Sequence, residues 1–142
     1  MEKRELSKAE WLSKAEAYCA KSEHCAADVR RKLYEWGAGE DLFDEIEEIL
    51  YRDGFLDDAR FCAAYVHDKV EYQSWGRRKI EAGLYALHIP DREIHKALEE
   101  IDENTYFKNL RKLNEQRRSD PEEKRLRFLL QRGFTYDEIK RV

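Results

Sequence analysis

The sequence predicts an all-α protein made of three tandem three-helix repeats, which we expect to stack into an elongated, curved body. Apolar residues recur at helical spacing along the chain, and no segment alternates with period two. Two prolines and six glycines in 142 residues leave long stretches uninterrupted. Apolar residues make up 42% of the chain and charged residues 41%, which is typical of helices with one buried stripe and one solvated face.

The first helix begins with a complete capping box. The Ser7 side chain can accept from the backbone of Glu10, whose carboxylate can reach back to Ser7. The second and third helices are predicted from apolar spacing and from their ends, because a glycine after each one supplies a left-handed terminal residue. The stripes are Trp11, Ala15 and Tyr18; Val29, Leu33 and Trp36; and Leu42, Ile46 and Ile49, and the terminating glycines are Gly37 and Gly54.

The next three helices repeat this pattern with weaker caps. Asp57 can cap the fourth helix, with Leu56 and Phe61 on either side at the positions of a hydrophobic staple. The sixth helix has the same staple spacing, but Pro90 occupies the capping position and supplies no side-chain acceptor. The stripes are Phe61 and Tyr65; Ile80, Leu84 and Leu87; and Ile94, Ala97 and Ile101.

The last three helices have the clearest starts. Asp102 can cap the seventh helix. Asp120 is the expected cap of the eighth helix, with Pro121 at its first helical position. Thr135 and Glu138 form a capping box for the ninth helix. The stripes are Tyr106, Leu110 and Leu113, and Leu126, Leu129 and Leu130; Gly133 ends the eighth helix, and the ninth begins at Tyr136.

These elements repeat along the chain. A shift of 45 residues places Leu56 on Ile101, Phe61 on Tyr106 and Glu93 on Glu138. The first repeat needs a shift of about 50, and its third helix departs further, because "GAGEDLFDEI" is about three residues longer and lacks the staple. We therefore expect repeats near 5–55, 56–100 and 101–142, because units of this length cannot bury their apolar faces alone. The alternative is a compact nine-helix bundle in which the repeat is only an evolutionary trace.

Charge is distributed unevenly. Residues 1–103 contain 16 Lys/Arg against 25 Asp/Glu, whereas residues 104–142 contain 11 against 6, so the two parts carry about −9 and +5. A basic end can face phosphates or an acidic protein surface, although charged runs are also typical of solvated helix faces.

No segment resembles a signal peptide or a membrane span, so a cytoplasmic protein is expected.

Metal and catalytic sites are not indicated. Cys19, Cys25 and Cys62 lack CxxC spacing, and Cys62 and His67 fall on different helix faces, so neither a zinc site nor a disulfide framework is expected. No phosphate-binding, dinucleotide-binding or hydrolase motif occurs. The acidic stretches "EDLFDEIEE" and "RDGFLDD" leave a metal-dependent nuclease as an alternative, but their carboxylates spread around a helix. We expect no cofactor, no metal and no catalytic residues.

Basic residues cluster on the middle helix of each repeat, and they are the candidate interaction surface. On an elongated body such clusters could follow a phosphate backbone or a groove lined with carboxylates, or they could serve solubility alone. The clusters are Arg30, Arg31 and Lys32; Arg77, Arg78 and Lys79; and Lys124, Arg125 and Arg127.

Nearby aromatic residues could stack on bases, but helical spacing places most of them in the core. These are Trp36, Tyr72, Trp75, Tyr85 and Tyr136, and Trp75 is the one to test.

The sequence resembles the RecX family of recombination regulators from about Ala15 to Ile139. The resemblance is carried by "AYCAKSEHCAADVRRKLYEWG", by "YRDGFLDDARFCAAYV", by the Gly-Arg-Arg-Lys-Ile segment and by "RFLLQRGFTYDEI". Its most specific parts are "GFLDDARFCAAYV" and "LLQRGFTYDEI", which helical repeat proteins in general do not share.

The resemblance implies a non-enzymatic modulator of the RecA recombinase. Such a protein would bind the RecA filament on single-stranded DNA, lie in its helical groove, and inhibit ATP hydrolysis, strand exchange and co-protease activity in recombination and the SOS response. It would act as a monomer, and the family function carries over to the three basic clusters rather than to a catalytic site. The alternative is a stand-alone DNA-binding protein that acts through its basic C-terminal third.

Overall fold

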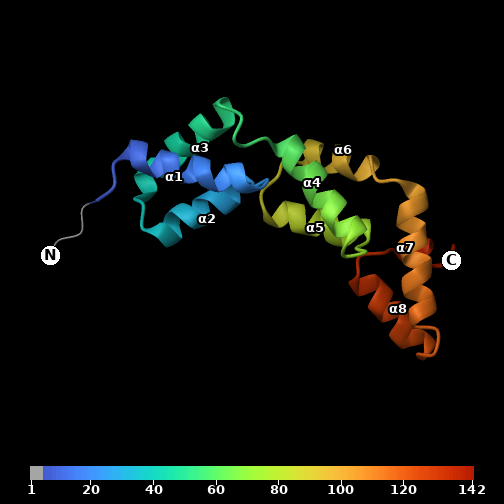
Figure 1. The fold of residues 1–142 in the computed structure, drawn as a ribbon. Helices are drawn as coiled ribbons and strands as arrows, with labels where there is room; N and C mark the ends of the chain where they lie inside the picture. The colour runs from blue at the N-terminus through green and yellow to red at the C-terminus, as the bar shows by residue number, and fades with distance from the viewer. Residues whose placement is uncertain (1–4) are drawn as a thin grey trace. The chain divides into compact units, whose positions relative to one another are not determined.

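The computed structural model describes residues 5–142, which are helical with no strand (Figure 1). The predicted all-α class is confirmed. The described elements are α1 (Lys8–Lys21), α2 (Ala26–Trp36), the 3-10 turn η1 (Glu40–Leu42), α3 (Phe43–Arg52), α4 (Asp58–Glu71), α5 (Arg77–Ala86), α6 (Asp91–Glu99), α7 (Glu103–Gln116), α8 (Glu122–Gln131) and α9 (Tyr136–Ile139).

Most of the predicted helix starts are present. Complete capping boxes begin α1 at Ser7 and α9 at Thr135, and the Asp102 carboxylate accepts from the backbone of Thr105 at the start of α7. The expected terminating glycines have φ of 93° at Gly37, 80° at Gly54 and 103° at Gly133. All three therefore adopt the left-handed conformation that favours glycine.

The predicted start of the eighth helix is wrong by one residue. Pro121 is the N-cap of α8 and supplies no side-chain acceptor, so Asp120 does not cap this helix. A carboxylate oxygen of Asp120 instead lies 3.5 Å from the Arg117 guanidinium, three residues earlier. An ion pair within the preceding turn has replaced the expected cap.

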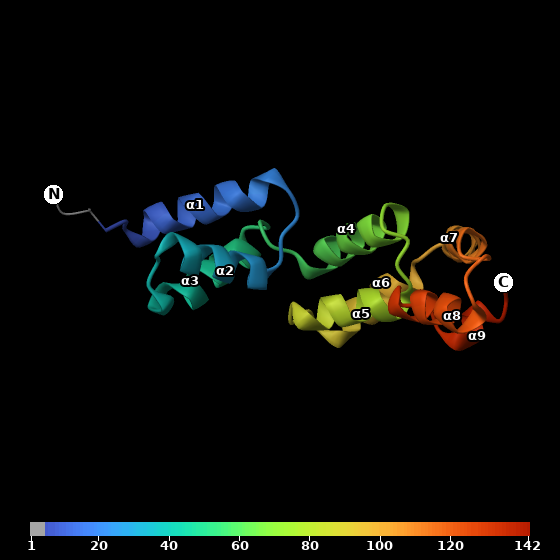
Figure 2. The ribbon, with the colours of Figure 1, turned by 90° about the horizontal axis from the view of Figure 1, so that it is seen from below.

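The chain divides into two compact units, the first ending at Phe61 and the second spanning Cys62–Val142. In the first unit, α1, α2 and α3 pack around one apolar cluster (Figure 2). The three-residue turn η1 immediately precedes α3 and accounts for the extra length predicted for the third helix. The fully enclosed members of this cluster are Ala15, Leu33, Ile46 and Leu50.

The second unit contains most of α4 together with α5–α9, and two glycines allow its backbone segments to approach closely. The Gly76 N–H donates to the Arg132 carbonyl at 2.7 Å, and the Arg78 N–H donates to the Gly133 carbonyl at 3.1 Å. A Cβ placed on Gly76 would lie 2.2 Å from the Gly133 carbonyl carbon, so only glycine fits. The start of α5 is thus joined directly to the turn between α8 and α9.

Candidate interaction surface

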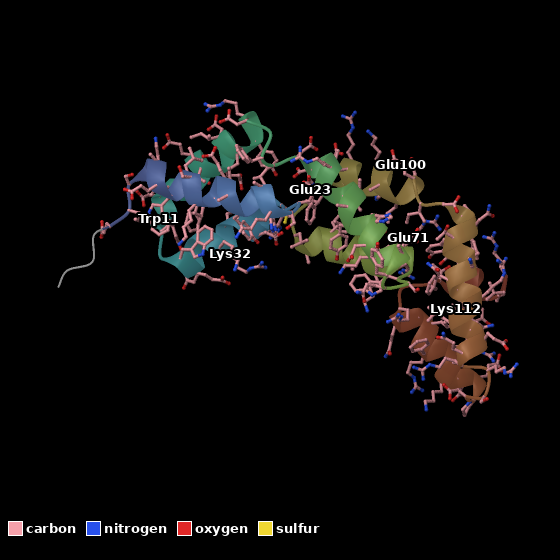
Figure 3. The ribbon with its side chains drawn as sticks, viewed as in Figure 1. Trp11, Glu23, Lys32, Glu71, Glu100 and Lys112 are labelled. Carbon is pink, nitrogen blue, oxygen red and sulfur yellow. The ribbon has the colours of Figure 1, made fainter. Side chains whose placement is uncertain are left out.

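The basic cluster on α2 is largely neutralised within its own unit. The Arg30 guanidinium lies 2.6 Å from Asp44 and 2.8 Å from Glu47, both on α3, and hydrogen bonds to these carboxylates raise its pKa further. Arg31 lies 3.6 Å from Asp28, and Lys32 lies within 3.4 Å of an acidic neighbour on the same helix. Arg30 therefore joins α2 to α3, whereas Arg31 and Lys32 (the latter labelled in Figure 3) pair with acidic residues of their own helix.

In the second unit, the first residue of the α5 cluster is a structural contact. The Arg77 guanidinium lies 4.2 Å above the ring centre of Tyr106, forms an ion pair with Glu103, and lies 3.5 Å from the Glu138 carboxylate. It also donates to the Leu98 carbonyl at 3.5 Å. Arg77 thus contacts residues from α6, α7 and α9, which leaves its guanidinium little freedom to bind a partner.

Tyr106 and Glu138 complete this junction. The buried Tyr106 hydroxyl accepts from the Arg77 N–H at 3.0 Å and donates to the Glu138 carboxylate at 3.0 Å. Burial raises the pKa of Tyr106 well above its ordinary value, and the nearby carboxylate raises it further. The Glu138 carboxylate that caps α9 therefore also holds α9 against α5 and α7.

The next residues of the α5 cluster lie beside the end of α8. Arg78 is exposed and has no ion pair with any residue of 5–142, while the Lys79 ammonium lies 4.4 Å from the ring centre of Trp75. Together with Leu130 they line an open hollow of about 320 Å³. The other lining residues are Gln131, Gly133 and Phe134.

The α8 cluster adds two more free cations. Lys124 and Arg127 are exposed, and neither has an acidic partner within the described part of the chain. Arg125 is half-buried, and its Nε atom is buried without a hydrogen-bond partner. Arg127 precedes Leu130 by three residues, which places both on one face of α8, the face that borders the hollow.

The structure thus shows two contrasting kinds of side chain among the nine predicted residues. Arg30 and Arg77 make internal ion pairs, whereas Arg78, Lys124 and Arg127 present unpaired charge to solvent. Sequence spacing could not distinguish them, because the acidic partners of Arg30 and Arg77 lie on other helices. The structure brings Arg78 and Lys79 next to α8 through the contact between Gly76 and Gly133.

The expectation that most nearby aromatic residues are core is wrong for three of the five. Tyr72, Tyr85 and Tyr136 are 75%, 41% and 54% exposed. Trp75 is half-buried, and the ammonium groups of Lys69 and Lys79 lie 4.7 and 4.4 Å from its ring centre. An indole already held between two cations is a less open stacking surface than Tyr72.

Leu130 was also expected in the core, but it is 46% exposed. Leu129 and Leu130 are consecutive on a helix and differ by about 100° in direction, so a single packed face can enclose only one of them. Leu129 is the enclosed residue, and Leu130 is left on the rim of the hollow.

The described residues bear on metal-binding clusters, membrane-spanning helices and reactive thiols as follows. Within residues 5–142 no three His, Cys, Asp or Glu side chains gather in a way that could hold a metal ion, and no helix there is long and apolar enough to cross a membrane. Burial raises the pKa of Cys19 and of Cys25 to about 11, so at neutral pH both thiols stay protonated and are poor nucleophiles.

Comparison with known proteins gives one consistent result. A family model described as "RecX, second three-helix domain" matches residues 57–98. The regulatory protein RecX of Geobacillus kaustophilus is 31% identical over 135 residues, which cover 89% of this chain and 49% of that protein. The regulatory protein RecX of Leptothrix cholodnii is 28% identical over 131 residues, which cover 88% and 82%.

The fold is shared as well. A crystal structure of regulatory protein RecX superimposes with a TM-score of 0.76 at 23% sequence identity, covering 100% of this chain and 81% of that one. This chain spans about half the length of the Geobacillus relative and about four-fifths of the Leptothrix relative. The matched domain and the two relatives make the chain similar to RecX regulatory proteins, and the crystal structure of a RecX protein has the same fold.

Proposed function

We propose that this protein regulates the RecA recombinase by binding the RecA filament on single-stranded DNA. It acts in the cytoplasm as a monomer, occupies the helical groove of the filament, and inhibits ATP hydrolysis, strand exchange and co-protease activity. It does this by binding and not by catalysis. Similarity to the regulatory protein RecX of other organisms and the unpaired basic side chains of the second unit support this proposal.

The observation that carries the proposal is the contrast between paired and unpaired cations. A cation already held by a carboxylate gains little from a partner, because it must first lose that contact. Arg78, Lys124 and Arg127 have no such contact within residues 5–142, so a phosphate or an acidic groove wall can engage them directly. The nine predicted residues remain the proposed surface, and these three are expected to contribute most of its binding energy.

The direct test is RecA-dependent ATP hydrolysis on single-stranded DNA. We expect several-fold molar excess of this protein to reduce the steady-state rate, and the combined Arg78→Ala, Lys124→Ala and Arg127→Ala variant to inhibit far less. The matched control removes three exposed cations elsewhere in the second unit and should inhibit as the unmodified protein does. Its changes are Arg92→Ala, Lys96→Ala and Lys112→Ala.

Two outcomes would contradict the proposal in different ways. Unchanged ATP turnover at several-fold excess of the unmodified protein would remove RecA regulation itself. Equal inhibition by both triple variants would leave RecA regulation in place and remove the basic surface. Circular dichroism on each variant would show whether the helices are retained.

A second function is favoured by the charge of the C-terminal third. Residues 104–142 contain 11 Lys/Arg against 6 Asp/Glu, so a stand-alone DNA-binding protein would follow phosphates with this part of the chain. Such a protein would bind naked DNA in the absence of RecA, with an affinity that falls steeply as salt is added. The salt titration described below distinguishes this function from binding that requires RecA.

A further inference from the structure

A second hollow in the Cys62–Val142 unit has an acidic rim and an apolar floor. It lies between the C-terminal half of α4 and the turn from α6 to α7, and its volume is about 220 Å³. Figure 3 labels two of its rim residues, Glu71 on α4 and Glu100 after α6. The lining residues are Val66, His67, Val70, Glu71, Glu100, Ile101, Asp102 and Thr105.

The carboxylates on the rim are placed where the fold gains little from them. Glu71 is the last residue of α4, and Glu100 is the C-cap of α6. The C-terminal end of a helix carries partial negative charge, so a carboxylate there is disfavoured. Both side chains are exposed, and neither has an ion pair with any residue between 5 and 142.

Asp102 adds a third negative charge, although it has a structural role. Its carboxylate accepts from the backbone and hydroxyl groups of Thr105, each at 2.9 Å, and these hydrogen bonds hold its pKa below the usual value. Three carboxylates and the C-terminal ends of α4 and α6 therefore lie around one opening, together with His67 and the N-terminal end of α7 that Asp102 caps; no Lys or Arg lines it.

The floor of the hollow is apolar and firmly held. Val66, Val70 and Ile101 are 7%, 5% and 8% exposed, so their side chains pack inward and leave only a small surface facing the hollow. The Asn109 side chain on α7 donates to the Val70 carbonyl at 2.9 Å. This bond joins the end of α4 to α7 and keeps the two walls at a fixed separation.

We propose that this hollow binds an arginine side chain of a partner protein. The aliphatic stem would cover the apolar floor, and the guanidinium would lie between the carboxylates of Glu71, Glu100 and Asp102. Its volume is smaller than the roughly 300–1,000 Å³ of sites for drug-sized ligands, but it suits a single long side chain. Arginine fits better than lysine, because a planar, weakly hydrated guanidinium can bridge two carboxylates.

This surface is distinct from the basic residues proposed to face the RecA filament, since it has the opposite charge. It shares no residue with the hollow beside Arg78. The partner recognised here therefore needs a basic segment, whereas the basic surface needs an acidic or phosphate-bearing one. Failure of either proposal leaves the other intact.

The test uses n-butylguanidinium as a probe and follows backbone amide signals of the full chain by NMR. We expect saturable shifts that centre on Val70, Glu71 and Ile101. Guanidinium, which has no stem, and n-butanol, which has no charge, should each produce much smaller shifts at matched ionic strength. Shifts spread evenly over all acidic side chains, or equal shifts with guanidinium alone, would overturn the proposal.

Matched variants test the carboxylates. The double variant Glu71→Gln with Glu100→Gln should bind the probe about tenfold more weakly. Glu99→Gln is the control: it removes a neighbouring exposed charge that does not line the hollow, and it should leave probe binding unchanged. The double variant should also melt about 2 °C higher, because two charges leave helix C-termini. A lower melting temperature together with unchanged probe binding would assign these carboxylates a structural role and overturn the proposal.

A second copy of this chain is the remaining source of an arginine. Analytical ultracentrifugation over a range of concentrations distinguishes the two sources. Sedimentation as a monomer, with binding to an arginine-rich peptide that the double variant loses, supports a separate partner. Self-association that the double variant abolishes would assign the hollow to a homodimer and overturn the proposal of a separate partner.

Discussion

At the scale of single residues, the buried Tyr106 links α5, α7 and α9 of the second unit. Its hydroxyl accepts one hydrogen bond from the Arg77 backbone and donates another to Glu138, while its ring contacts the rings of Phe107 and Phe134. A phenolate could not donate to Glu138 and would face its negative charge. The fold therefore requires the neutral form of this side chain.

The raised pKa of Tyr106 predicts a loss of stability in alkali. Its cause is burial, supported by the Glu138 carboxylate. An unfolded chain releases the tyrosine proton near pH 10, whereas the folded chain retains it. The unfolded state then binds fewer protons, so the stabilisation is complete below about pH 10 and is lost as pH rises toward the folded-state pKa.

Tyr106→Phe isolates this contribution. At neutral pH the free energy of unfolding should fall by about 1–3 kcal/mol in the variant, because the partly buried Arg77 N–H loses its acceptor. Urea unfolding between about pH 8 and 11 should show a shallower loss of stability than in the unmodified protein. Tyr72→Phe is the control, since that side chain is 75% exposed. Parallel pH profiles for the Tyr106 variant and the unmodified protein would contradict the prediction.

The buried thiols lead to a second prediction at this scale. Cys19 and Cys25 are 9% and 1% exposed, and burial raises the pKa of each to about 11. Because the thiolate is the reactive form, we expect iodoacetamide at neutral pH to modify them only when the first unit unfolds. Mass spectrometry of peptides after labelling, with and without urea, measures this. Labelling of the folded protein at the rate of free cysteine would count against it.

At the scale of elements, the sequence predicts features that depend on residues close together in the chain, and it misses contacts between residues that are far apart in the chain. The capping boxes at Ser7 and Thr135 involve residues three positions apart, so they are visible in the sequence and present in the structure. The predicted Asp120 cap is absent, since Pro121 is the N-cap of α8 and the Asp120 carboxylate lies beside Arg117. The ion pairs of Arg30 and Arg77 had no sequence signal, since their partners lie on other helices.

The close contact between Gly76 and Gly133 is another long-range feature. The sequence marked Gly133 as a helix terminus from its position, but nothing local to Gly76 indicated that a second backbone segment would approach it. A Cβ on Gly76 would overlap the Gly133 carbonyl and the Phe134 nitrogen at 2.2–2.4 Å. These are backbone atoms that cannot rotate away.

Gly76→Ala should therefore destabilise the second unit by about 3 kcal/mol, through overlap and through strain on the two hydrogen bonds between these segments. Gly83→Ala is the matched control within α5, because its Cβ would meet the hydroxyl and ring of Tyr65, a side chain that can move away, instead of backbone atoms. Alanine also favours a helix over glycine by about 1 kcal/mol. Thermal unfolding by circular dichroism compares the two. Equal melting temperatures would show that the backbone contact is not needed.

At the scale of the whole molecule, the two units differ in charge. Residues 1–61 contain 10 Lys/Arg against 16 Asp/Glu, and residues 62–142 contain 17 against 15, so the units carry about −6 and +2. Within residues 5–61, the cluster on α2 also lies beside its own acidic neighbours. Composition predicted a positive C-terminal third, but only the structure separates paired from unpaired cations.

This difference predicts where single-stranded DNA would be held. In a titration with salt, each phosphate contact that is lost reduces the slope of log affinity against log salt by about 0.7. The combined Arg78→Ala, Lys124→Ala and Arg127→Ala variant should therefore reduce this slope by about 2. The double variant Arg31→Ala with Lys32→Ala should leave the slope nearly unchanged, because acidic side chains already neutralise those two cations. Fluorescence anisotropy with a labelled oligonucleotide measures both, with and without RecA. A slope that depends on α2 instead would mean that its ion pairs open on binding, and that local charge pairing does not decide which cations contact DNA.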